Sequence, residues 1–254
     1  IGLAALSDSA GLDEAPTTYH AGYVLGPRVN AGGRVGESSL GIRLLSTSDV
    51  GAAKAIALRL GEFNKERQSI EADVLEAATA QIEARGEMPA EIIIAAGAGW
   101  QAGVVGIVAS RLKERFSRPA IVIAGAEGVG KASCRSIVGV DIGGAITAAR
   151  QAGLLLNGGG HAMAAGFTLA ASNVDIFKEY ITKRISSGVA DPDVRPPLMV
   201  DATLTVQGAT TELVQTLTRL GPFGSGNAEP RFAISNLRVA KADVVGKEHV
   251  RCYL

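Results

Sequence analysis

The clearest hydrophobic pattern in the chain is helical and runs over residues 49–85. Apolar side chains recur there every three or four residues, at Ile56, Leu60, Phe63, Ile70, Val74, Ala78 and Ile82. Ser48 is the expected N-cap, and Gly86 with Pro89 should end the helix. At 1.5 Å per residue the helix would extend for roughly 55 Å, a length typical of a connection between two lobes. Gly61 marks a position where it could kink.

The pattern changes to alternating strands and helices after residue 90. Residues 91–96 are typical of a buried strand, 104–116 of a helix with an apolar face, and 120–124 of a second buried strand. This order predicts a βαβ unit, in which a right-handed crossover joins two parallel strands. A short strand near 132–138 should follow, and then a helix that Asp141 caps.

The later part of this block alternates in the same way. The segment NGGGHAMAAG is expected to form a loop, a strand should cover 167–170, and a helix should cover 174–185. Residues 186–197 hold three of the nine prolines and are typical of a linker. Apolar residues then alternate from Leu198 to Val206 as in a half-buried strand. A helix over about residues 211–220 and a Gly/Pro-rich turn follow.

These elements predict an α/β protein with a small mixed sheet, a βαβ core and flanking helices over residues 87–188. A long connecting helix over 49–86 precedes this domain, and a truncated strand-rich region over 198–254 follows it. Residues 1–48 look irregular, and the Gly/Arg/Asn-rich stretch 26–36 fits neither the helical nor the strand period. Both ends of the chain look cut, because it begins without Met and ends inside a strand-like pattern.

Composition narrows the function classes. The chain has 254 residues, of which 47% are hydrophobic and 20% charged, as in a folded globular protein. With 25 basic and 25 acidic residues the net charge is zero. Any binding of nucleic acid must therefore depend on a local cluster of basic residues rather than on the overall charge. Cys134 and Cys252 are too few for a disulfide framework or a four-cysteine zinc site. The sequence has no membrane-spanning apolar run and no secretory signal, which indicates a cytoplasmic protein without a membrane partner.

Two glycine-rich segments imitate nucleotide-binding loops. Residues 97–103 follow a strand, but their GxGxxxG spacing is one residue too long for a dinucleotide fingerprint, and Trp100 would crowd a pyrophosphate. Residues 125–132 nearly match a P-loop, but Ala132 replaces the hydroxyl residue that should hold Mg²⁺. The sequence after Ala132 does not open a helix, so no helix dipole would face a phosphate.

A third glycine segment, Gly158-Gly159-Gly160-His161, is the strongest candidate for chemistry. Three consecutive glycines permit positive φ and let backbone N–H groups approach an anion. His161 can donate to a phosphate oxygen or stack on a base. From the spacing alone, a tight turn with a packed histidine is the favoured interpretation.

Several blocks, taken in order, resemble the RecJ family, single-strand-specific exonucleases of the DHH phosphodiesterase superfamily. They lie at residues 26–34, 63–71, 99–124, 131–141, 157–167 and 221–232. The ordered set is highly specific and spans essentially the whole chain. Two places depart from the family pattern. Trp100-Gln101 stands where the family has Trp-His, and the block from Ala132 to Ser136 lacks the two glycines of the family's Gly-Ser-Gly-Arg-Ser.

The resemblance implies a domain order. Residues 1–48 would end the catalytic DHH lobe, 49–86 would be the connecting helix, 87–188 the DHH-associated nucleic-acid-binding domain, and 198–254 the start of an OB fold. It also implies 5′-to-3′ hydrolysis of single-stranded DNA in recombination and repair. The implied partner is a single strand with a 5′ end, with a helicase or a single-strand-binding protein as further candidates.

The resemblance further implies Mn²⁺ or Mg²⁺ as cofactor, bound by Asp and His residues upstream of this chain. The histidines here, His20, His161 and His249, are widely scattered and form no cluster with aspartates. No metal site is therefore expected in this chain, which should not cut DNA by itself.

The matched blocks suggest a 5′-phosphate clamp of Arg135 with Ser133 and Ser136. A guanidinium fork fits phosphate geometry, and hydroxyls add short hydrogen bonds. The competing interpretation of Arg135 is a surface salt bridge. Arg28, Asn30 and Arg34 would reach the DNA from the connecting side, although bracing of the interface between lobes is an equally weighted role for Arg28 and Asn30.

Gly158, Gly159, Gly160 and His161 are expected to face the metal centre and position the scissile phosphate, with His161 in a supporting catalytic role. Trp100 could stack on a base, but packing in the core is the safer expectation. A solvated helix face is expected for Arg111, Lys113 and Arg115.

Other functions stay open at this level. An oligoribonuclease or nucleotide phosphatase of the same superfamily is disfavoured by the linker and the strand-rich region after Leu198. A metal-less relative that acts as a replication scaffold differs only in the upstream lobe. A P-loop NTPase would require stabilisation of the chain by nucleotide.

Overall fold

The computed structural model describes residues 1–84, 86, 91–126, 128–186, 198–246 and 249–254. The chain forms two compact units, residues 1–194 and 195–254. The predicted linker falls almost entirely outside the described residues, because only Ser186 of that segment is described.

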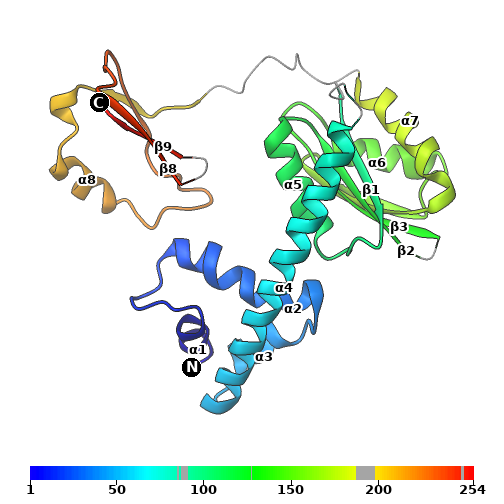
Figure 1. Cartoon of the computed structure of the whole chain (residues 1–254), viewed down its shortest axis with the longest axis horizontal. Coiled ribbons are helices and arrows are strands. Elements are labelled where there is room, and N and C mark those ends of the chain that lie inside the picture. Colours follow the sequence, from blue (N-terminus) through cyan, green and yellow to red (C-terminus); the bar gives the residue numbers. More distant parts are fainter. Residues whose placement is uncertain (85, 87–90, 127, 187–197, 247–248) are drawn as a thin grey trace. The chain divides into compact units, whose positions relative to one another are not determined.

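The first unit begins with short helices packed on one long helix (Figure 1). They are α1 (Gly2–Ser9), the π-helical η1 (His20–Leu25), α2 (Gly26–Val35), α3 (Leu40–Ser46) and α4 (Val50–Glu83). The prediction of irregular structure over residues 1–48 is therefore wrong, and the stretch 26–36 forms α2 except for its last residue, Gly36. Glycine disfavours a helix by propensity alone. Here tertiary packing decides, because α2 buries Ala31 and Gly32, and a Cβ on Gly32 would collide with the Glu37 carbonyl oxygen.

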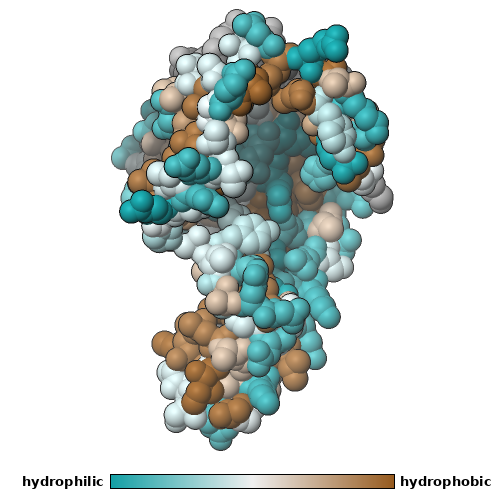
Figure 2. Space-filling model, turned by 90° about the vertical axis from the view of Figure 1, so that its left-hand side faces the viewer, coloured by the Kyte–Doolittle hydropathy of each residue, from teal (hydrophilic) through white to brown (hydrophobic). Residues whose placement is uncertain are grey.

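These N-terminal helices also expose large apolar side chains. Figure 2 shows apolar surface over this part of the molecule, at the foot of the view. The exposed residues include Leu3, Tyr19, Tyr23, Ile42 and Leu45.

Helix α4 joins two separate cores. Asp49 rather than Ser48 is its N-cap, since the Asp49 carboxylate accepts a hydrogen bond from Ala52 N at 2.9 Å. The helix runs uninterrupted through Gly61. Its first half packs with α1 to α3 through Ala53, Ile56, Ala57, Leu60 and Phe63. Its second half packs with the α/β domain through Val74, Ala78 and Ile82.

The α/β domain contains a five-stranded mixed sheet in the order β1-β2-β3-β5-β4. Its elements are β1 (Ile93–Ala98), α5 (Val105–Phe116), β2 (Ala120–Ala126), β3 (Val129–Arg135), α6 (Ile142–Gln151), β4 (Asn157–His161), β5 (Ala164–Ala170), η2 (Ala171–Asn173) and α7 (Val174–Ser186). β1 and β2 are parallel and joined by α5, which confirms the predicted βαβ unit. The other pairs are antiparallel.

The predicted loop over residues 157–166 is wrong, because a hairpin occupies that segment. Gly158 to His161 form β4, an edge strand that turns back into β5, and none of its three glycines has positive φ. The near-P-loop segment is the tip of the β2–β3 hairpin, where Lys131 pairs with Ala124. The P-loop interpretation is excluded, because no helix follows that turn.

A side chain protects the outer edge of β1. The Gln81 side-chain amide donates to the Ala96 carbonyl oxygen, and its oxygen accepts from Ala96 N, both at 3.0 Å. The amide thus takes the place that a neighbouring strand's backbone would occupy. An unpaired edge invites association with other chains, and α4 blocks that edge here.

The two faces of the sheet are covered unequally. Helices α6 and α7 lie on one face and bury Cys134, Phe167 and Leu169 of β3 and β5 (Figure 1). On the other face, α5 and the end of α4 form an apolar cluster with β1 and β2 that includes Ile93 and Val122. That cluster contains no described residue of β3, β4 or β5, and this half of the face is reached only at β3, by the start of α5.

The second unit is strand-rich. Its described elements are β6 (Ala202–Leu204), η3 (Val206–Gly208), α8 (Thr211–Thr218), β7 (Phe232–Ile234), β8 (Lys241–Val245) and β9 (His249–Tyr253). The alternation from Leu198 to Val206 yields only the three residues of β6, so the longer predicted strand is wrong. β6 pairs with β7 in parallel, and β8 with β9 antiparallel.

No helix within the described parts of either unit combines the length and the apolar character needed to cross a bilayer.

Candidate nucleic-acid interface

Strand register builds a polar surface on the open half of the sheet. Residues directly opposite each other in antiparallel strands share one face. Across β3, β5 and β4 the register therefore forms three rows: a first row of Arg135, Ala164 and His161, a second of Ser133, Gly166 and Gly159, and a third of Lys131, Thr168 and Asn157. The intervening residues face the opposite way, into the core under α6 and α7.

A cavity of about 530 Å³ lies over the second and third rows. Ala102 and Val105, at the start of α5, also line it. Its lining residues include Lys131, Ser133, Asn157 and Thr168, but no acidic residue among the described ones. This composition favours an anionic ligand.

A larger cavity is a weaker candidate. It has a volume of about 750 Å³ and is lined by the start of α6 and the end of α7. Asp141 contributes a carboxylate to its lining, and Lys183 is already paired with Glu179. The smaller cavity has the clearer charge preference.

The first turn of α5 meets Ser133 and Arg135. A Cβ placed on Gly106 would lie 3.3 Å from both the Ser133 hydroxyl and an Arg135 guanidinium nitrogen. Glycine at this position therefore lets both polar side chains rest against the start of the helix. No side chain caps that end, and a helix N-terminus favours negative charge.

Arg135 is half-buried and only partly engaged. Its Nη1 donates to the Cys134 carbonyl oxygen at 2.8 Å, which leaves further donors of the fork without a hydrogen bond to the described residues. No carboxylate pairs with it in the described part of the chain. The competing salt-bridge interpretation of Arg135 thus finds no acidic partner there.

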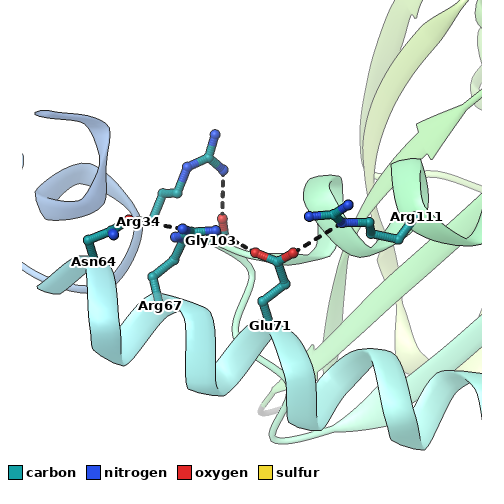
Figure 3. Close-up of polar contacts among 6 residues, drawn as sticks. All are labelled: Arg34, Asn64, Arg67, Glu71, Gly103 and Arg111. Carbon is teal, nitrogen blue, oxygen red and sulfur yellow. Dashed lines mark hydrogen bonds and ion pairs between the residues drawn. The ribbon is translucent and has the colours of Figure 1, made fainter. Parts of the chain in front are cut away.

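The predicted arginines of α2 divide into two cases. Arg34 is exposed, and its Nη1 donates to the Gly103 carbonyl oxygen at 3.0 Å, just before α5 (Figure 3). It therefore reaches the same end of α5 as Arg135. Arg28 instead donates to Val24 O, one turn back on its own segment, at 2.7 Å. Asn30 is exposed on α2 and is not among the residues that line the cavity over the second and third rows.

The three glycines of β4 serve different purposes. A Cβ on Gly158 would press on Phe167, and one on Gly160 would press on Ala165, so both positions need glycine for packing. Gly159 has nothing within 4 Å of where its Cβ would be, and it lies in the second row on the open face. His161 is exposed at the end of the first row.

Ser136 is placed differently from its two neighbours in the predicted clamp. It is 1% exposed, and its hydroxyl donates to the Val140 carbonyl oxygen at 2.7 Å. This hydrogen bond closes the turn between β3 and α6. The buried hydroxyl does not reach the open face, which is at odds with direct contact to a phosphate.

A buried polar network holds α5 on α4 between the two cores (Figure 3). Glu71 accepts from Arg67 on one side and from Arg111 on the other, where the Arg111 Nε lies 3.4 Å away. Arg67 also donates to Asn64 Oδ1 at 2.9 Å. The expected solvated face on α5 is confirmed for Arg111 and Arg115, which are 59% and 55% exposed while they pair with Glu71 and Glu83 of α4, whereas the Lys113 side chain is only 28% exposed.

Trp100 packs on the core as expected. Its ring lies directly over Gly97, where a Cβ would overlap it, and it borders the cluster of α4, α5 and β1.

The thiol of Cys134, beside Arg135, is inert. Burial raises the pKa of Cys134 to about 12, and the nearby guanidinium only partly opposes this, so the thiol stays protonated at neutral pH.

Sequence reasoning missed Lys131, Asn157, Thr168 and Gly106. The alternation of polar residues at 131, 133 and 135 was a readable signal, since such residues share one face of a strand. Within the described residues, no group of three His, Cys, Asp or Glu side chains is placed to hold a metal ion.

Comparison with known protein families matches two segments of the chain, one within each unit. Residues 90–187 match the DHHA1 domain, and residues 200–254 match the RecJ OB domain. The single-stranded-DNA-specific exonuclease RecJ of Bacillus subtilis is 35% identical over 234 residues, which cover 91% of this chain and 29% of that protein. The Escherichia coli protein of the same name is 34% identical over 237 residues, covering 91% and 41%.

A solved structure agrees. The crystal structure of RecJ in complex with Mn²⁺ from Thermus thermophilus superposes with a TM-score of 0.86 at 30% identity, covering all of this chain and 37% of that one. A second structure of the same protein contains Mg²⁺. The chain thus spans between 29% and 41% of the length of these relatives.

Proposed function

Since this chain belongs to the RecJ family, we propose that it is the substrate-binding part of a metal-dependent exonuclease that degrades single-stranded DNA from the 5′ end. The proposal includes action in the cytoplasm, in recombination and repair, with a helicase or a single-strand-binding protein as partner. The observation that carries it is the meeting of Ser133, Arg135 and the start of α5 beside a cavity without acidic lining among the described residues.

In this proposal the terminal phosphate binds at the start of α5. The unengaged donors of the Arg135 fork and the Ser133 hydroxyl hold its oxygens, and the N-terminal end of the helix adds a favourable dipole. Arg34 approaches the same end of α5 from α2 and contributes a second positive charge. A 5′-phosphate carries more negative charge than an internal phosphodiester, so a cluster of this kind favours strand ends.

The remaining predicted residues have supporting roles. His161, exposed at the edge of the first row, contacts the 5′-terminal nucleotide, and Gly159 leaves space over the second row for the strand to pass. Ser136 shapes the turn that follows Arg135. Arg28 and Asn30 act through the α2 framework, because Arg28 is bound to Val24 O.

The solved relatives contain Mn²⁺ or Mg²⁺, and we extend the use of a divalent ion to the whole enzyme. The described residues of this chain do not fit such an ion, because they provide no cluster of His, Cys, Asp or Glu ligands. In this proposal the ion is bound by other parts of the enzyme, and the residues here bind and orient the strand.

Equilibrium binding tests the phosphate clamp. The chain is titrated with fluorescently labelled single strands that differ only in carrying a 5′-phosphate or a 5′-hydroxyl. Arg135→Ala should weaken binding of the phosphorylated strand by about tenfold to a hundredfold, because a hydrogen bond to a charged group contributes about 1.5–3 kcal/mol. Binding of the hydroxyl strand should change much less.

Arg59→Ala is the matched control, since it removes one exposed arginine of α4 that is paired with Glu62. It should leave both affinities nearly unchanged. Equal losses on both strands after Arg135→Ala would refute the clamp and reduce Arg135 to a general electrostatic contact.

A further inference from the structure

The third row on the open face has no role in the clamp described above, although it lies in the same cavity. Lys131, Thr168 and Asn157 line that cavity together with Ser133. We propose that this row is a second phosphate subsite, which binds the internucleotide phosphodiester next to the 5′-terminal phosphate. The inference rests on the proposed function, because it assumes that Arg135 and Ser133 hold the terminal phosphate.

Charge supports this subsite. Lys131 is exposed, and no ion pair connects it to any described residue. Lysines elsewhere in this domain are paired on their own helices, such as Lys178 with Asp175 and Lys183 with Glu179. An unpaired lysine beside a cavity that has no acidic residue among the described ones attracts an anion.

The two partners of Lys131 in the row supply hydrogen-bond donors. Asn157 Oδ1 accepts from Gly158 N at 2.8 Å, so the NH₂ group of its side chain remains available as a donor. Thr168 is half-buried, and its hydroxyl has no hydrogen bond to the described residues. An ammonium, an amide NH₂ and a hydroxyl side by side match the oxygens of a phosphodiester.

Spacing supports a second phosphate rather than a second contact to the first one. Residues two apart on a strand are separated by about 6.6 Å, so Lys131 lies roughly 13 Å along β3 from Arg135. The second row, Ser133 with Gly166 and Gly159, lies between them and carries no large side chain. Arg135 and Ser133 hold the terminal phosphate toward one end of β3, so the Lys131 side chain, farther along the strand, is left to bind the next phosphate.

Ligands with one or two phosphates distinguish binding at the first subsite from binding at the second. The chain is titrated with a 5′-phosphorylated mononucleotide and with a 5′-phosphorylated dinucleotide, each in competition with a labelled single strand. Lys131→Ala should weaken the dinucleotide by about tenfold or more and leave the mononucleotide within about twofold. With longer strands, the slope of log affinity against log salt should become shallower by about 0.7, the value for one lost phosphate contact on a single strand.

Companion variants complete the test. Lys131→Arg should keep dinucleotide binding, and Thr168→Val, which removes only a hydroxyl, should weaken it by a smaller factor. Lys183→Ala removes a lysine of α7 that is paired with Glu179, and it should affect neither ligand. Fluorescence of Trp100 confirms that each variant is folded.

Each remaining outcome decides between the proposals. If Lys131→Ala weakens both ligands equally, or weakens neither, the second subsite is wrong. Arg135→Ala in the same assay should weaken the mononucleotide and the dinucleotide alike. If that variant has no effect either, the phosphate clamp of the proposed function fails as well, so the two failures are distinguishable.

Discussion

The buried network on α4 allows a quantitative test of what joins the two cores of the first unit. The Arg67 and Glu71 side chains are 11% and 10% exposed, and Arg111 adds a contact from α5 whose side chain is 59% exposed. Replacing Glu71 by Gln keeps the shape but removes the charge that balances the buried Arg67. Breaking a buried pair from one side costs about 3–5 kcal/mol, and the exposed Arg111 contact adds little.

We therefore expect Glu71→Gln to lower the free energy of unfolding of the first unit by about 3 kcal/mol. Urea denaturation followed by tryptophan fluorescence measures this, because Trp100 is the only tryptophan and packs against the cluster of α4 and α5. Glu62→Gln provides a matched control on the same helix. Glu62 pairs with Arg59 at 2.7 Å, but their side chains are 64% and 56% exposed, so the loss should stay within about 1 kcal/mol.

A second variant separates a charge effect from a packing effect. Replacing Arg67 by Met and Glu71 by Leu together removes both charges and keeps apolar volume at the interface. A buried ion pair can often be replaced in this way without loss, so the double variant should be clearly more stable than Glu71→Gln. If Glu71→Gln lowers stability no more than Glu62→Gln does, the network does not hold the two cores together and the reasoning is wrong.

Three further predictions concern single groups. Burial raises the pKa of Cys134 from 9.0 to about 12, so the thiol of the unfolded chain ionises at a lower pH than the folded one. The free energy of unfolding, measured relative to Cys134→Ala, should therefore fall above about pH 9. Paired urea titrations should show a decrease of at most about 1.4 kcal/mol per pH unit. Gln81→Ala should speed hydrogen exchange at the Ala96 amide and cost about 1 kcal/mol, since the edge of β1 loses both bonds. Ser136→Ala should cost about 1–3 kcal/mol in urea denaturation while the folded chain keeps its preference for 5′-phosphorylated strands; loss of that preference would return Ser136 to direct contact with phosphate.

Errors in the predicted elements have a common cause. The helix α2 and the strand β4 are both rich in glycine, which has low intrinsic preference for either structure. Each forms because a neighbouring element needs a close approach, α2 against α4 and β4 against Phe167 and Ala165. A glycine that is required because a neighbouring element packs closely against it gives no local sequence pattern. Secondary-structure propensity therefore cannot predict the element that contains it.

The candidate site divides in the same way. Ordered blocks of sequence pointed to Arg135, Ser133 and His161, and alternation could have added Lys131. Their arrangement in rows depends on the register between β3 and β5. These two strands are not adjacent in the sequence, because α6 and β4 lie between them. The pairing of Arg111 with Glu71 likewise crosses from α5 to α4.

By itself, the sequence determined the βαβ unit, the long helix and the cap at Asp141, and it pointed to the RecJ family, because these inferences depend on local periodicity and on motifs that are contiguous in the chain. Only the tertiary structure decided which polar residues share the open face, which charges are neutralised, and which of the three glycines of β4 faces the cavity. Those properties depend on contacts between segments that are distant in the sequence. A local sequence pattern cannot predict them, because it carries no information on which segments pack together.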